Sequence, residues 1–159
     1  MFLGESFGNP DNGDGIQACG IREQLPEMRM IGALKLVFNQ NPIVFEEHQN
    51  WYLKKIAQPD CIYLLGKWEN NIVGSLRFDI TNNTALISYL VSPKYHGKGF
   101  GRIILAKGLD YLATHTANIT IANGYVLPQN IASIKVFERL AFDCTTENNQ
   151  LLFSKKINR

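Results

Sequence analysis

The chain of 159 residues, 45% of them apolar, is long enough for one globular domain with a substantial core. The basic residues behind its net charge of +2 are scattered, which argues against a nucleic-acid-binding protein. Its three cysteines lack metal-ligand spacing, so we expect no metal site, no disulfide framework and a reducing, cytoplasmic setting. No apolar run approaches the roughly 20 residues of a membrane-spanning helix.

The first part of the chain carries the weakest structural signals. Gly4 to Gly20 is rich in Gly, Asn and Asp, a composition that predicts turns or disorder. Met28 to Phe38 is apolar, but its pattern does not separate a helix from a strand. We therefore expect a flexible N-terminal segment over residues 1–27 and a single domain over residues 28–159.

The remaining chain shows a clear succession of elements. The expected helices are Glu46–Gln58, Gly101–His115 and Asn130–Leu140, and the expected strands are Cys61–Trp68, Ile72–Ile80, Thr84–Val91, Ile119–Val126, Phe142–Thr146 and Leu151–Lys155. Short Asn-containing turns separate the first three strands, which favours an antiparallel meander. This order predicts an α/β (α+β) fold in which helices cover a mixed sheet.

A loop between the third strand and the next helix places glycine at every second position, with the sequence HGKGFG over residues 96–101. Its backbone N–H groups can approach an anion, and the positive end of the helix points the same way. A Walker loop would need Lys and a hydroxyl where Arg102 and Ile103 stand, and a dinucleotide fingerprint would need Gly-x-Gly-x-x-Gly. A plain turn would need only one or two glycines. The loop therefore predicts a diphosphate site.

Two motifs resemble the GNAT superfamily of N-acetyltransferases. Val91–Gly101 resembles the acyl-CoA pyrophosphate loop of that superfamily, and Asn130–Phe142 is similar to the helix that lies against its cofactor. The resemblance runs from about Phe38 to Ile157 and is closest to bacterial enzymes that acetylate nucleotide-linked amino sugars for surface glycans. It implies a mostly antiparallel sheet with two splayed strands that leave a cleft for the acyl-CoA.

The resemblance also implies which residues contact acetyl-CoA, the expected donor. These cofactor-binding residues are Leu90, Val91, His96, Gly97, Lys98, Gly99, Phe100, Gly101, Arg102, Asn130, Ser133 and Phe137. The Val91 N–H is expected to point at the thioester carbonyl, where one preorganised donor contributes about 3 kcal/mol. Asn130 is expected to bind the pantetheine arm, while helix capping is a simpler role that can hold at the same time.

The groups that move protons are less clear. The superfamily often carries a tyrosine at the position of Phe137, which has no proton to give, although a thiol pKa near 8.5 eases departure of the thiolate. We expect Tyr125 to be the catalytic substitute, with an edge or core tyrosine as an equal alternative. Asp79, Glu47 and His48 are candidate bases that also fit as solvated or capping residues, and a water relay is the fallback.

These patterns together predict an acetyl-CoA-dependent N-acetyltransferase that acts on a small-molecule amine. A nucleotide-linked amino sugar is the expected acceptor. A protein N-terminus or lysine remains an alternative acceptor, and a CoA-binding module without catalysis is an alternative of another class. We expect a monomer or homodimer that binds neither nucleic acid nor membrane.

Overall fold

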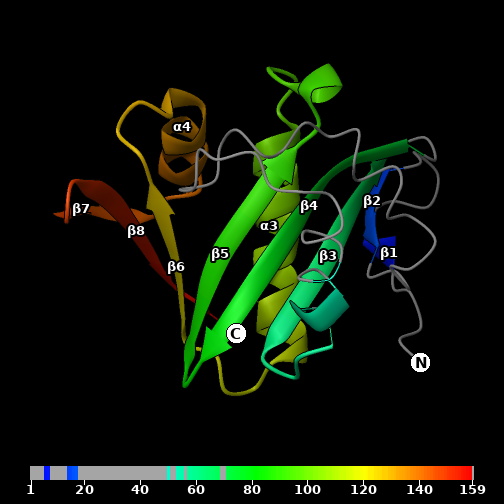
Figure 1. Cartoon of the computed structure of the whole chain (residues 1–159), viewed down its shortest axis with the longest axis horizontal. Coiled ribbons are helices and arrows are strands. Elements are labelled where there is room, and N and C mark those ends of the chain that lie inside the picture. The colour runs from blue at the N-terminus through cyan, green and yellow to red at the C-terminus, as the bar shows by residue number, and fades with distance from the viewer. Residues whose placement is uncertain are drawn as a thin grey trace.

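The computed structural model describes residues 6–7, 14–17, 50, 53–55, 57–68 and 71–158. Its strands are β1 (Ser6–Phe7), β2 (Asp14–Gln17), β3 (Cys61–Trp68), β4 (Asn71–Thr81), β5 (Thr84–Val91), β6 (Ile121–Val126), β7 (Asp143–Glu147) and β8 (Gln150–Lys156). The longer helices of the described residues are α3 (Phe100–His115) and α4 (Ile131–Arg139) (Figure 1). A short 3-10 helix spans Pro93–Tyr95.

Within the described residues, the strands form one sheet in the order β1-β2-β3-β4-β5-β6-β8-β7. Neighbouring strands run antiparallel except for β5 and β6, which run parallel. The expected mixed, mostly antiparallel sheet is therefore confirmed. The expected strands β3 and β5 agree with the structure at both ends, and the other expected elements from β4 onward lie within two residues of the observed bounds.

Asparagines make the tight turns of two hairpins. The backbone φ is 53° at Asn82, between β4 and β5, and 48° and 63° at Asn148 and Asn149, between β7 and β8. Two-residue hairpin turns require a positive φ because their twist must match that of the strands. Asparagine tolerates a positive φ better than most residues. The Asn-Asn pairs thus set the register of these hairpins.

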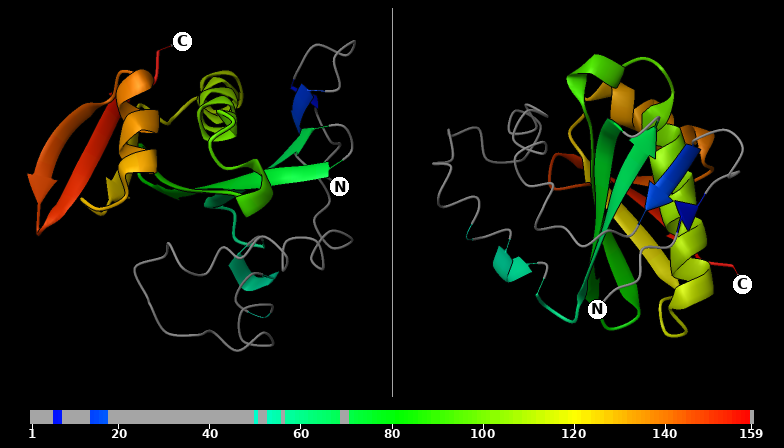
Figure 2. Two further views of the ribbon diagram at one scale, coloured as in Figure 1. Left: turned by 90° about the horizontal axis from the view of Figure 1, so that it is seen from above. Right: turned by 90° about the vertical axis from the view of Figure 1, so that its right-hand side faces the viewer.

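Helices α3 and α4 cover the same face of the sheet, as the left view of Figure 2 shows. The buried side of α3 consists of Ile104, Leu105, Gly108, Leu109 and Leu112. A Cβ on Gly108 would overlap the side chain of Leu76, which is fully buried on β4. Glycine at this position therefore allows the close approach of α3 to the sheet.

The N-terminal part corrects one expectation. β2 pairs with β3 from Asp14↔Trp68 to Gln17↔Leu65, so the expectation of turns or disorder is wrong at residues 6–7 and 14–17. The edge of β3 supplies backbone partners there, and such context overrides a low intrinsic strand propensity. Met28–Phe38 and most of the expected helix Glu46–Gln58 lie outside the described residues, although residues 50 and 53–55 are helical.

Candidate active site

The parallel strands β5 and β6 separate after a short paired stretch. Their register runs from Thr84↔Ile121 to Leu86↔Asn123, whereas the strands continue to Val91 and Val126. Figure 1 shows them diverging towards α4. We call residues 87–91 of β5 and 124–126 of β6 the splay. Because their facing backbone edges are not paired with each other, they can accept the amides of an extended ligand as an added strand.

The glycine loop lies at one end of the splay, between β5 and α3. Gly97 and Gly99 have φ values of 73° and 85°, and no atom lies within 4 Å of a Cβ built on either residue. Packing therefore does not explain these glycines, but their left-handed backbone does. The loop surface is exposed, and Lys98 adds a cation about 5.6 Å from the centroid of the Tyr95 ring.

The first turn of α3 is open at its N-terminus. The first bonds of the helix run from the N–H groups of Arg102 and Ile103 to the Gly99 carbonyl, and among the described residues no side chain caps the helix. The N–H groups before Arg102 therefore lack an intrahelical acceptor, and the helix dipole adds positive potential. Open space, free donors and nearby cations fit a diphosphate.

His96 has a local partner that the sequence did not predict. Its Nε2 donates to the carbonyl oxygen of Val91 at 2.8 Å. This bond connects the beginning of the glycine loop to the end of β5. His96 therefore positions the loop against the splay, and its expected contact with a phosphate remains a prediction.

Helix α4 borders the splay with a polar first turn. The Asn130 side chain caps the helix by accepting from the Ser133 N–H at 3.2 Å, which confirms the expected cap. The Ser133 hydroxyl in turn accepts from the Tyr89 hydroxyl on β5 at 3.0 Å. Tyr89 was missed in the sequence, although its alternation with Ile87 and Val91 places it on the helix-covered face.

A family model supports this reading of the geometry. The model of the acetyltransferase (GNAT) family matches residues 30–142, which include β5, the glycine loop and α4. The chain belongs to the GNAT family of acetyltransferases. It is therefore an acetyl-CoA-dependent N-acetyltransferase. The position of the acyl-CoA along the splay and on the glycine loop stays a prediction.

Solved structures of other proteins share the fold. The spermidine N-acetyltransferase of Vibrio cholerae, in complex with CoA and spermine, is 18% identical with a TM-score of 0.76, covering 91% of this chain and 96% of that one. The ribosomal alpha-N-protein acetyltransferase RimL, in complex with coenzyme A, is 18% identical with a TM-score of 0.79, covering 96% and 98%. A Methanocaldococcus jannaschii domain is 24% identical with a TM-score of 0.74, covering 92% and 99%. No curated protein sequence matches the chain.

Phe137, at the position where GNAT relatives often carry a tyrosine, is part of the core. Its ring is only 2% exposed, stacks on Phe153 and meets Phe142 edge-on, with both centroid distances 4.9 Å. Its Cζ lies 2.5 Å from the position of a Cβ built on Gly124 of β6. The para position therefore abuts the β6 backbone, and the described contacts of Phe137 are those of a packing residue.

Tyr125 of this GNAT chain lies on the opposite face of β6 from α4, because Ala122 and Val126 occupy the buried face. It is 37% exposed and donates its hydroxyl proton to Glu147 Oε2 at 2.9 Å. This acceptor raises the pKa of Tyr125. The hydroxyl thus interacts with the β7–β8 hairpin, and its expected role as the leaving-group acid is still a prediction.

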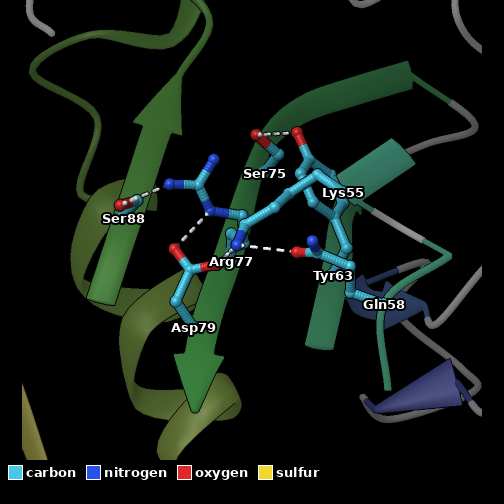
Figure 3. Close-up of polar contacts among 7 residues, drawn as sticks. All are labelled: Lys55, Gln58, Tyr63, Ser75, Arg77, Asp79 and Ser88. Carbon is cyan, nitrogen blue, oxygen red and sulfur yellow. Dashed lines mark hydrogen bonds and ion pairs between the residues drawn. The ribbon is translucent and has the colours of Figure 1, made fainter. Parts of the chain in front are cut away.

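The same face carries a polar cluster over β3, β4 and β5 (Figure 3). Asp79 forms ion pairs with Lys55 at 2.8 Å and Arg77 at 2.9 Å, and Arg77 also donates to the Ser88 hydroxyl at 3.3 Å. Both Asp79 oxygens therefore face cations, which makes this carboxylate a poor candidate for a base. The other two candidate bases, Glu47 and His48, lie outside the described residues.

The Tyr63 hydroxyl donates to Ser75 at 3.2 Å on the same face and connects β3 to β4. Burial raises the pKa of Tyr63 to about 12.

Among the described residues, no group of His, Cys, Asp and Glu has the arrangement of a metal site. No helix that the structure describes is both long and apolar enough to cross a membrane.

Proposed function

We propose that this N-acetyltransferase moves the acetyl group of acetyl-CoA to the amine of a nucleotide-linked amino sugar. The observation that carries the acceptor class is the polar cluster, in which two cations, Lys55 and Arg77, flank one carboxylate, Asp79. The excess positive charge attracts the diphosphate of such an acceptor and disfavours a polycationic amine.

The donor is proposed to lie along the splay with its diphosphate on the glycine loop. The N–H groups of residues 97–101 would bind the phosphate oxygens, and Lys98 and Arg102 would add charge. Leu90 and Val91 would pair with the pantetheine amides, and the Val91 N–H would donate to the thioester oxygen. The side-chain oxygen of Asn130 accepts the hydrogen bond that caps α4. The side-chain NH2 group of Asn130 would therefore donate to the pantetheine arm.

The acceptor is proposed to approach from the face opposite the helices. Helices α3 and α4 cover one face of the sheet (Figure 2). Ser88 belongs to the splay and is exposed on the other face, because it alternates with the buried Ile87. Arg77 contacts Ser88 and so places a cation on this face of β5, three residues before Val91. Residues of this face would orient the acceptor, and the neutral amine would reach the carbonyl carbon from there.

A panel of acceptors tests this proposal. The release of CoA from acetyl-CoA is measured with a UDP-linked amino sugar, the free amino sugar, spermidine, a peptide with a free N-terminus and a peptide with one internal lysine. We expect kcat/KM for the nucleotide-linked sugar to exceed every other value by at least about 10-fold, a difference of about 1.4 kcal/mol. A higher value for a peptide or for spermidine would reject the acceptor class.

The same panel tests the alternatives that the sequence leaves open. Acetylation of a peptide amine would identify a protein acetyltransferase, and CoA binding without turnover on any amine would identify a binding module. The cysteine usage supports a cytoplasmic site of action. Ionic strength gives a second readout, because an anionic acceptor attracted by surface cations binds more weakly as salt rises.

A further inference from the structure

The Tyr89 hydroxyl connects the two sides of the splay. Tyr89 lies on β5 within the stretch that β6 no longer pairs, and its hydroxyl donates to Ser133 on α4 at 3.0 Å. Its ring also lies 3.4 Å from the position of a Cβ built on Gly101, in the first turn of α3. The phenol is therefore held between the strand edge, the glycine loop and α4.

The surroundings of Tyr89 keep its hydroxyl protonated. Burial raises the pKa of Tyr89, and the hydrogen bond to Ser133 offsets part of this effect. The Phe137 ring meets the Tyr89 ring edge-on at a centroid distance of 6.1 Å and fixes its plane. Tyr89 is therefore a fixed neutral donor near neutral pH. Its acceptor is a neutral hydroxyl on the helix-covered face, whereas Tyr125 donates to the carboxylate of Glu147 on the other face.

We propose that the Tyr89 hydroxyl donates a hydrogen bond to the sulfur of CoA as the thiolate leaves, and that Ser133 is the positioning residue for this hydroxyl. The inference rests on the proposed placement of the donor along the splay. Rotation about the bond between the Tyr89 ring and its oxygen redirects the proton from Ser133 to the sulfur. Phe137 lacks a polar group. On the helix-covered side, the described residues of the splay and of α4 carry two hydroxyl groups, those of Tyr89 and Ser133.

The transfer balances without a further reactant. The acceptor nitrogen forms a bond to the carbonyl carbon, the C–S bond breaks, and its electron pair stays on sulfur. The nitrogen releases one proton to water, and the thiolate later takes one proton from water. Tyr89 remains protonated throughout, because its pKa lies above that of the thiol and it stabilises the charge on sulfur without giving up its proton.

Binding of CoA and desulfo-CoA, which lacks the sulfur, tests the contact directly. Calorimetry at a pH above the thiol pKa compares the wild-type chain with Tyr89→Phe, with Tyr125→Phe as the rival and Tyr63→Phe as the matched control. Tyr63 also donates to a serine of a neighbouring element, at 3.2 Å, but on the opposite face. We expect the wild type and Tyr63→Phe to prefer CoA by about 10-fold, and Tyr89→Phe to lose this preference.

Each outcome of this experiment decides between the claims. If Tyr89→Phe keeps the preference for CoA and Tyr125→Phe loses it, Tyr125 is the donor and the inference is overturned. If all variants keep the preference, no tyrosine tested contacts the sulfur, and the inference is again overturned. If the wild type binds neither ligand, the proposed donor site fails as well, which separates that failure from a failure of Tyr89 alone.

Kinetics give a second test. Tyr89→Phe should lower kcat by about 10- to 100-fold at unchanged KM for acetyl-CoA, and the loss should shrink with an acetyl thioester of a more acidic aromatic thiol. Ser133→Ala should lower kcat by less, and Ser133→Thr, which retains a hydroxyl, should restore it. Equal losses with both thioesters would overturn the inference. Thermal unfolding of every variant verifies that the fold is retained.

Discussion

The two faces of the sheet use different means to build the site. On the helix-covered face, the glycine loop and the open N-terminus of α3 present backbone donors, and few side chains take part. On the opposite face, charged and hydroxyl side chains of β4 and β5 form the polar cluster with Lys55. The proposed donor is thus recognised mainly by backbone geometry and the proposed acceptor mainly by side chains.

This difference explains why the donor follows from the sequence more directly than the acceptor. Alternating glycines before a helix have few structural explanations, and they imply an anion whatever their neighbours are. A charged side chain such as Arg77 has several structural explanations, because its contacts with Asp79 and Ser88 also stabilise the sheet. Changes in backbone conformation should therefore affect the donor, and changes in charge should affect the acceptor.

The largest effect is expected for Gly99→Val. Gly99 has a φ of 85°, a conformation that costs a β-branched residue about 1–3 kcal/mol, so the loop would rearrange and its N–H groups would leave the phosphates. We expect the Kd for acetyl-CoA, measured by calorimetry, to rise about 100-fold.

Lys98→Ala is the matched control for that variant, because it removes an exposed cation beside Gly99 and leaves the backbone unchanged. Exposed charges contribute little, so the Kd for acetyl-CoA should rise only about 3-fold. A larger effect for Lys98→Ala than for Gly99→Val would contradict recognition by the backbone.

Phe137→Tyr should destabilise the fold without raising activity. Its para position abuts Gly124 in the core, so an added hydroxyl is either compressed or buried without a partner. We expect the free energy of unfolding in urea to fall by about 1–3 kcal/mol, with kcat no higher than that of the wild type. A variant of equal stability and higher kcat would show that the ring position is catalytic after all.

Apart from the control Lys98→Ala, the smallest effect is expected for Arg77→Gln. This change removes the cation that contacts Ser88 and leaves the glycine loop intact. We expect KM for the nucleotide-linked amino sugar to rise about 10-fold, while the Kd for acetyl-CoA stays within about 2-fold. Equal weakening of both ligands would break the division between the two faces.

The sequence predicted the elements from β3 to β8 because their signals are local. Strand alternation, Asn-Asn turns and the capping Asn130 depend on neighbouring residues alone. Tyr89 and Phe137 could not be assigned in this way, because their roles depend on the packing of β5 against α4. The two residues of the Tyr89–Ser133 bond, for example, are 44 positions apart in the sequence. Strand β2 was missed because its partner edge on β3 lies far away in the sequence.

Amide hydrogen exchange with and without acetyl-CoA tests the central claim most directly. If the donor lies along the splay, acetyl-CoA should slow exchange at the amides of residues 97–101 and at Leu90 and Val91. Exchange in β7, on the far edge of the sheet, should not change. Protection of β7 with none in the glycine loop, or no protection at all at saturating acetyl-CoA, would contradict the account.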